Sequence, residues 1–209
     1  MRLLYTVQRY GEEVVGGSEA AARAFAERLV DRGHEVEVVT SCARSYVDWS
    51  DAYQPGVSNL NGVVVNRLPI EQLRRAERFG SLQSWMVSGP HPVPHFQQMR
   101  RAKHMGPDIA GYRRWLADNV KRFNAAIFMT YLYSTTTRGL PSASGRVPTL
   151  LQPTAHDEPP LWVRLYDTLA PGGSHHRSAG YGQHPHRTDT RPAFPSGPSA
   201  QQLLGGNQP

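Results

Sequence analysis

The sequence predicts an α/β fold: a single domain built on a mainly parallel sheet that is doubly wound by helices. Three observations predict this fold. Residues 1–41 contain an apolar run, an amphipathic segment and a second apolar run, which is the order of a β-α-β unit. A continuous apolar run at residues 125–130 is typical of a central parallel strand. Apolar runs alternate with amphipathic segments up to residue 169, which favours a parallel sheet covered on both faces.

The first expected helix opens on a glycine pair, Gly16 and Gly17. Ser18 is the expected N-cap, and Glu19 adds a negative charge to the first turn. Gly33 is expected to end the helix. A helix N-terminus offers unpaired backbone N–H groups, and glycine lets a ligand approach them closely. The unit therefore predicts a Rossmann-like anion site, and the alternative is that the glycine pair only turns the chain.

The next segments alternate between irregular chain, a turn and a strand. Residues 41–60 are expected to be irregular, and the dipeptide Asn61–Gly62 predicts a tight turn. Residues 63–68 form the third expected strand, after those at residues 1–8 and 36–40. The hydrophobic pattern of residues 70–88 is ambiguous and allows a short helix.

Two helices are expected between residues 93 and 123. The first spans residues 93–105, with Phe96, Met99 and Lys103 along one side. The second begins at Pro107, which suits a first helical turn, and Asp108 adds a favourable charge there. Its expected buried stripe consists of Ile109, Tyr112, Leu116, Val120 and Phe123.

The character of the sequence changes near residue 170. Residues 171–209 contain no Val, Ile, Met, Trp, Lys or Glu, and 13 of these 39 residues are Gly or Pro. Such a segment buries too little apolar surface to offset the entropy lost on ordering. We expect a folded domain at residues 1–169 and a disordered Gly-, Pro- and His-rich tail at residues 170–209.

The amino-acid composition argues against several classes of protein function. The net charge is +6 and the pI is about 9.8, but no basic stripe carries aromatic residues, so no nucleic-acid partner is expected. Cys42 is the only cysteine, which fits a reducing compartment, and we expect a cytoplasmic protein. No apolar run approaches the length of a membrane span, so no transmembrane segment is expected. The basic run at residues 100–103 is expected to be a solvated helix face, with a weak membrane-surface contact as the minority interpretation.

Three polar loops are expected to converge, because ligands of a parallel sheet bind outside the carboxyl ends of its strands. These loops follow the expected strands at residues 1–8, 125–130 and 147–152. Carboxylates and hydroxyls suit a polyol such as a sugar, and the glycine turn suits a phosphate. The candidate residues in the three loops are Glu12, Gly16, Gly17, Tyr131, Tyr133, His156, Asp157 and Glu158.

Several candidates also have a purely structural interpretation. His156 is either a functional group at the carboxyl end of a strand or an ordinary surface histidine. Asp157 and Glu158 are expected to cap a helix rather than to act as acid–base catalysts. Tyr131 and Tyr133 either present their hydroxyls to a ligand or close the rim of the site by packing.

No metal ion and no cofactor are expected. The four histidines at i and i+2 positions in the tail lack a preformed ligand geometry. A Gly-x-Gly-x-x-Gly motif is absent, and Thr40–Ser41 stands where a dinucleotide-binding strand ends in an acidic residue. The sequence also lacks the Gly-Lys-Ser/Thr of a phosphate loop and the Gly-x-Ser-x-Gly nucleophile elbow.

Several of these segments together resemble the N-terminal domain of GT-B glycosyltransferases, of the retaining family four. The resemblance covers about residues 1–169. It is carried by Gly-Gly-Ser-Glu at residues 16–19 with the amphipathic helix and the Arg-Gly-His-Glu-Val that follow, by Asn-Gly-Val at residues 61–63, by the run at residues 127–131, and by the loop at residues 152–157.

The resemblance implies an enzyme with two Rossmann-like domains that transfers a sugar from a nucleotide-sugar donor to a sugar or glycolipid acceptor. The N-terminal domain of this family takes the acceptor, the C-terminal domain takes the donor, and no bound metal is usual. By resemblance, Gly16 and Gly17 approach the donor phosphate or the acceptor. His156 lies by the transferred sugar and is the catalytic candidate, in the same loop as Asp157 and Glu158.

The chain departs from this family because a second domain is missing. Glu19 and Glu27 have the spacing of the two donor-side glutamates of the family, but they lie on the first expected helix, so we treat the match as coincidence. We expect a glycosyltransferase truncated near residue 170, with an out-of-frame tail and negligible activity alone. The alternatives are a non-catalytic module that binds a sugar or sugar phosphate, and a vestigial product without function.

Overall fold

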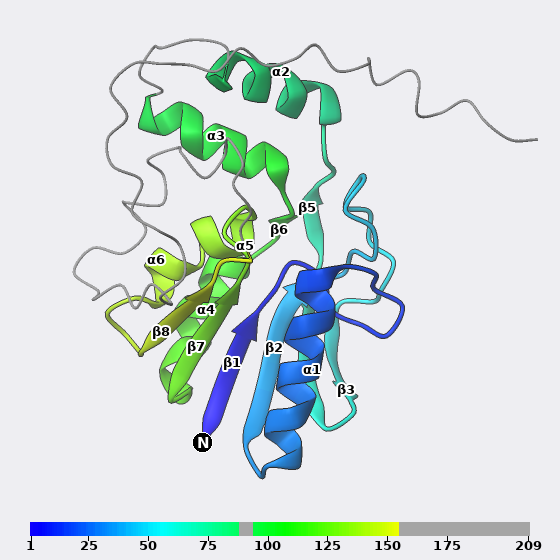
Figure 1. Ribbon diagram of the computed structural model, residues 1–209, viewed down its shortest axis with the longest axis vertical. Helices are drawn as coiled ribbons and strands as arrows, with labels where there is room; N and C mark the ends of the chain where they lie inside the picture. Colours follow the sequence, from blue (N-terminus) through cyan, green and yellow to red (C-terminus); the bar gives the residue numbers. More distant parts are fainter. Residues whose placement is uncertain (88–93, 155–209) are drawn as a thin grey trace, which may run out of the picture. The chain divides into compact units, whose positions relative to one another are not determined.

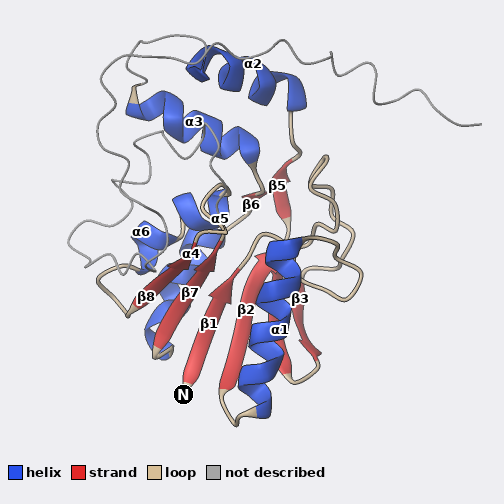
Figure 2. Cartoon of the chain, in the orientation of Figure 1, coloured by secondary structure: helices blue, strands red, loops and turns tan. Residues whose placement is uncertain are grey.

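The computed structural model describes residues 1–87 and 94–154, which belong to one compact unit, Met1–Gly173. Its centre is a six-stranded, mostly parallel sheet with helices against both faces (Figure 1, Figure 2). The expected α/β class and the mainly parallel sheet are thus confirmed. In spatial order, the strands are β3 (Gly56–Leu60), β4 (Val63–Leu68), β2 (Glu35–Ser41), β1 (Arg2–Thr6), β7 (Ala125–Met129) and β8 (Thr149–Gln152).

Every neighbouring pair in this sheet is parallel except β3 and β4. The exception is the hairpin that closes through Asn61 and Gly62, which have φ angles of 51° and 84°. Positive φ at both central residues is the geometry that an Asn-Gly hairpin turn requires, so the predicted tight turn is confirmed. The strand before it was not expected, because the side chains of Gly56–Leu60 are mostly exposed and show no apolar alternation.

Alternate residues of the central strands point into two separate cores. Leu4 and Val39 belong to the core under α4 (Tyr112–Asn119), whereas Tyr5 and Val38 belong to the core under α1 (Gly17–Asp31). Successive side chains of a strand face opposite sides of the sheet, so continuous apolar runs are what a strand buried on both faces needs. Residues 125–130 were recognisable as such a strand, and residues 36–40 were recognisable from their three valines.

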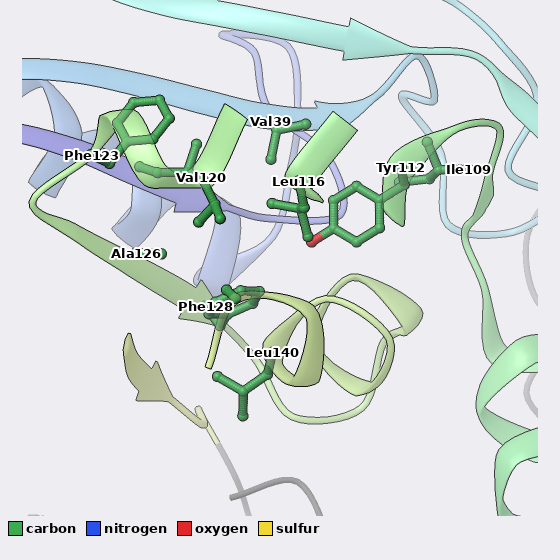
Figure 3. Close-up of a cluster of buried hydrophobic side chains, with 11 residues drawn as sticks. Val39, Ile109, Tyr112, Leu116, Val120, Phe123, Ala126, Phe128 and Leu140 are labelled. Atoms are coloured by element: carbon green, nitrogen blue, oxygen red, sulfur yellow. The ribbon is translucent and has the colours of Figure 1, made fainter. Parts of the chain in front are cut away.

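The core under α4 contains the whole apolar stripe that the sequence predicts. The side chains of Ile109, Tyr112, Leu116, Val120 and Phe123 are all buried, and Figure 3 shows them grouped beside Val39, Phe128 and Leu140. The helix itself starts later than expected. Residues Asp108–Ile109 form a short strand, β6, against β5 (Ile70–Gln72), and a 3₁₀ turn, Val120–Arg122, follows α4.

The prediction that Pro107 begins a helix with Asp108 in its first turn was therefore wrong. Asp108 is buried and its carboxylate pairs with Arg138 at 2.5 Å and with Lys103 at 3.3 Å. Just after β6, the backbone N–H of Ala110 donates to the carbonyl of Pro69. These long-range partners hold the segment in an extended conformation, and no local sequence pattern predicts them.

The helix at residues 93–105 exists as α3 (His95–Met105), but it buries a different face from the one expected. Gln98, Arg101 and Ala102 are buried, whereas Phe96 is 60% exposed. The buried face packs on a further helix, α2 (Ala76–Val87), where the Arg101 Nε donates to Gln83 Oε1. Polar residues thus take the interior positions of this helix pair.

Two short helices, α5 (Ser134–Thr137) and α6 (Leu140–Ala143), occupy the segment between β7 and β8. The first replaces part of the hydroxyl-rich loop expected at residues 131–137. It forms because the backbone N–H groups of Thr136 and Thr137 both reach the carbonyl of Tyr133 at 3.0 Å. α6 packs Leu140 and Ala143 into the core under α4.

Among the described residues, no helix is long and apolar enough to cross a membrane. The expected helix after Pro159, the boundary near residue 170 and the tail all lie outside the described residues.

Candidate functional site

The order of the parallel strands reverses between β1 and β7. From β1 the chain adds β2 and β4 on one side, and then returns to add β7 and β8 on the other. Such a switch point is where the loops at the carboxyl ends of parallel strands diverge and where ligands bind in open α/β sheets. Thr6 of β1 pairs with Phe128 of β7 in the last pair of this ladder, and Gln8 and Thr130 each follow two residues later in the chain.

A buried ion pair organises the loop that follows β1. The side chains of Arg9 and Glu19 are only 6% and 4% exposed, and Arg9 Nε donates to Glu19 Oε1 at 2.8 Å. The other guanidinium nitrogens donate to the carbonyl oxygens of Arg44 at 2.9 Å and Val15 at 3.2 Å. Arg9 therefore ties three segments together: its own loop, the first turn of α1 and the loop after β2.

The two glycines at the start of α1 have different surroundings. A Cβ on Gly16 would lie 2.4 Å from Glu19 Oε2 and 3.0 Å from Arg9 Nη2. Its φ of 165° is ordinary extended backbone, so the close approach of the ion pair, and not conformation, requires glycine there. A Cβ on Gly17 would meet nothing within 4 Å, and Gly17 is exposed. Only Gly17 leaves open space for a ligand at the N-terminus of α1.

The helix begins differently from the prediction, because Gly16 and not Ser18 is its N-cap. Ser18 lies inside the first turn, where its hydroxyl donates to Glu19 Oε2 at 2.6 Å and accepts from Gln8 Nε2 at 3.3 Å. The N-cap prediction was wrong because the Ser18 hydroxyl donates to the Glu19 carboxylate instead of accepting a hydrogen bond from a backbone N–H. The expected helix end is confirmed: Gly33 has φ of 80°, and its N–H donates to the carbonyl of Val30.

The loop that follows β7 carries Tyr133 to the same edge of the sheet. Burial raises the pKa of the Tyr133 phenol, the Glu19 carboxylate raises it further, and Arg9 opposes both effects. Tyr131, in the same loop, is only 2% exposed.

The sequence interpretation missed the loop that follows β2. The Arg9 guanidinium lies 5.2 Å from the ring centroid of Tyr46, and the ring of Trp49 meets Tyr133 edge-on at 5.5 Å. Trp49 is fully buried, and its Nε1–H donates to the carbonyl of Met105 at 2.9 Å. A signal for this loop was present: β2 is parallel to β1 and adjacent to it, so its following loop must reach the same edge.

Among the buried polar atoms that have no hydrogen-bond partner within the described residues, two lie just after the ends of β1 and β7. These atoms are Gln8 Oε1 and Thr130 Oγ1, whose residues are 1% and 5% exposed. Thr130 also has φ of 62°, a conformation that β-branched residues rarely adopt. Unpaired buried polar groups and backbone strain are both concentrated at functional sites. We call the set formed by Gln8, Arg9, Gly17, Glu19, Thr130 and Tyr133 the switch-point edge.

Of the remaining candidate residues from the sequence, only Glu12 belongs to the described part of the chain. Glu12 is exposed in the loop between β1 and α1, and the next residue, Glu13, pairs with Arg44 at 2.9 Å. His156, Asp157 and Glu158 lie outside the described residues. Of the predicted residues, the structure places Gly16 against the Arg9–Glu19 pair and Gly17 next to it at the open start of α1.

The switch-point edge, together with the neighbouring Tyr46, combines three kinds of polar and aromatic groups. The first turn of α1 supplies backbone N–H groups that have no partner within the helix. Tyr46, which is 52% exposed, supplies an aromatic ring, and Gln8 and Thr130 supply polar oxygens. Within residues 1–87 and 94–154, no group of three or more His, Cys, Asp or Glu side chains is placed to hold a metal ion.

Comparison with protein-family models and with curated proteins found no match to this chain. The class that the structure itself defines is an α/β protein with a mostly parallel central sheet and a polar edge at its switch point.

Proposed function

We propose that the described domain is a Rossmann-like unit that binds the sugar-bearing substrates of a glycosyl transfer at the switch-point edge. The substrates are a nucleotide-sugar donor and a sugar or glycolipid acceptor. The observation that carries the proposal is the open space beside Gly17 at the first turn of α1, at the sheet edge that also holds the unpartnered oxygens Gln8 Oε1 and Thr130 Oγ1.

The charges of this edge fit a ligand that is mostly polyol. Glu19 lies in the first turn of α1, where the helix dipole stabilises a negative charge, and Arg9 neutralises it. The edge therefore carries little net charge from this pair. Hydroxyl groups of a sugar can accept hydrogen bonds from the free backbone N–H groups in the first turn of α1.

The first turn of α1 supports the anionic part of the substrates. In glycosyl transfer, negative charge grows on the leaving phosphate, and preorganised donors stabilise it. The N–H groups at Gly17 and Ser18 begin a helix, and Gly17 leaves the space beside them open. We assign the contact with the transferred sugar to the loop of His156, with His156 as the catalytic candidate and Asp157 and Glu158 beside it.

Calorimetric titration of the full chain tests the binding step. The probes are UDP-glucose, GDP-mannose and glucose 6-phosphate. We expect at least one probe to bind, and the Gly17→Glu substitution to weaken that binding about tenfold or more, because a carboxylate then occupies the open helix start. The matched control is Gly80→Glu, since Gly80 is an exposed helical glycine in α2 with nothing within 4 Å of its Cβ position.

Two outcomes contradict the proposal: no probe binds, or Gly17→Glu and Gly80→Glu have equal effects. If a nucleotide sugar binds, release of its nucleoside diphosphate in the presence of simple sugar acceptors separates an enzyme from a non-catalytic binding module. Loss of that release in His156→Ala, with binding unchanged, is the expected result for a catalytic His156.

A further inference from the structure

A basic groove lies on the helical layer that covers the α4 face of the sheet. It encloses about 580 Å³ and is lined by residues of α3, α4 and the α5–α6 segment. None of its lining residues belongs to the switch-point edge. The residues that matter here are Arg113, Arg114, Thr137, Arg138, Ser142 and Arg146.

Positive charge is in clear excess in this groove. Arg138 pairs with the buried Asp108, but Asp108 also pairs with Lys103, so one carboxylate is shared by two cations. Arg114 approaches Asp118 at 3.8 Å, with side chains that are 89% and 65% exposed. Such an exposed pair interacts weakly in water.

The two other arginines have no carboxylate partner among the described residues. Arg146 Nη1 donates to the carbonyl of Ala117 at 3.1 Å, which holds the side chain against α4 and leaves its charge uncompensated. Arg113 is exposed and takes part in no ion pair within the described part of the chain.

The groove also contains an unpartnered hydroxyl. Thr137 is 1% exposed, and its Oγ1 makes no hydrogen bond to any described residue. Ser142, in contrast, donates to the carbonyl of Arg138 at 3.0 Å. Arginines without carboxylate partners that line one groove point to a ligand that supplies acceptor oxygens.

We propose that this groove binds a small molecule carrying phosphoryl groups, at a site separate from the switch-point edge. Guanidinium groups present paired N–H donors that match phosphate oxygens, and several arginines converge here on one volume. Pockets for small molecules usually enclose about 300–1,000 Å³, which includes the volume of this groove. The arginine side chains line one groove instead of forming an extended basic stripe on the surface. This arrangement favours a small ligand over a nucleic acid.

Titration of the full chain with pyrophosphate tests this site. We expect saturable binding, and a loss of affinity of about tenfold or more in the double variant R113Q/R146Q, because each arginine contributes a charge-assisted contact. The matched control is R28Q/R32Q, which removes two exposed arginines from the end of α1 and the residue after it. The control is expected to keep the wild-type affinity.

Thermal unfolding is a second test of this site, and it does not depend on the heat of binding. Pyrophosphate is expected to raise the melting temperature of the wild type and of R28Q/R32Q, but not of R113Q/R146Q, since a ligand stabilises only the state that binds it. The proposal is overturned if pyrophosphate does not bind, or if both double variants lose affinity equally. Binding only to phosphatidylglycerol vesicles, with no response to pyrophosphate, also overturns it, because the partner is then a membrane surface.

Discussion

At the scale of single residues, Gly16 and Gly17 have different roles: packing requires Gly16, whereas Gly17 leaves space for a ligand. Gly16 is required by the Arg9–Glu19 pair, which leaves no room for a Cβ, whereas the Cβ position of Gly17 faces open space. We predict that Gly16→Ala lowers the free energy of unfolding by about 1–3 kcal/mol, because a methyl group must displace a buried carboxylate. Gly17→Ala is expected to change it by less than about 0.5 kcal/mol. Urea denaturation of the two variants measures the difference, and equal losses in both would contradict this account of Gly16.

A second prediction at this scale concerns the pH dependence of Cys42. Burial raises the pKa of the Cys42 thiol from 9.0 to about 11, and the nearby carboxylate of Asp51 adds to the rise. The unfolded chain therefore loses this proton at a lower pH than the folded chain does. The stabilising contribution of the protonated thiol is complete below pH 9 and is lost as the pH rises towards 11.

The Cys42→Ala variant isolates this contribution, because buried tyrosines also titrate at high pH. We expect the free energy of unfolding to fall more steeply between pH 8.5 and about 11 in the wild type than in Cys42→Ala. Iodoacetamide labelling of the native protein near pH 8 should be slow, since the thiol is fully buried. Rapid labelling in native buffer would show that Cys42 is accessible.

At the scale of elements, the hairpin between β3 and β4 depends on Gly62. Its φ is 84°, and a Cβ there would lie 2.7 Å from Val30 Cγ1 of α1. Gly33, at the end of α1, has a similar φ of 80° but nothing within 4 Å of its Cβ position. We predict that Gly33→Ala costs about 1 kcal/mol from backbone strain alone, and that Gly62→Ala costs about 2–3 kcal/mol because steric overlap is added.

Thermal and urea unfolding of these two alanine variants give the comparison directly. A larger loss in Gly33→Ala than in Gly62→Ala would mean that the hairpin does not rest on α1 as described.

The elements also show which parts of the fold the sequence could predict. The strand β7 is a continuous apolar run and β2 is rich in valine, so their composition identifies them. The strand β3 has exposed side chains and is defined only by its pairing with β4. The interior face of α3 escaped prediction for a related reason. Arg101 is buried there by its contact with Gln83 of α2, a long-range pairing that no periodicity reveals.

The candidate site could be predicted in outline but not in its organisation. The rule that loops gather at the carboxyl ends of parallel strands brought Gly17 and Tyr133 to one edge. The Arg9–Glu19 pair was not predicted, because burial of two charged side chains depends on the surrounding loops. The same holds for Trp49, whose burial follows from its contacts with Met105 and Tyr133.

At the scale of the whole molecule, the described domain carries two surfaces with different chemistry. The switch-point edge is nearly neutral at its ion pair and holds unpaired oxygens, which suits sugar hydroxyls. The basic groove carries several arginines with little compensation, which suits phosphoryl groups. The surfaces share no residue, so substitutions in one should leave ligand binding at the other unchanged.

Hydrogen exchange of the full chain, with and without the sugar-bearing probe that binds, tests the central claim most directly. The account predicts slower exchange of backbone N–H groups at residues 8–19 and 130–134, because the ligand covers the first turn of α1 and the loop after β7. It predicts unchanged exchange in α4 and α6, which border the basic groove. Protection confined to those helices, with none at residues 8–19, would place the sugar elsewhere and contradict the switch-point edge as its binding site.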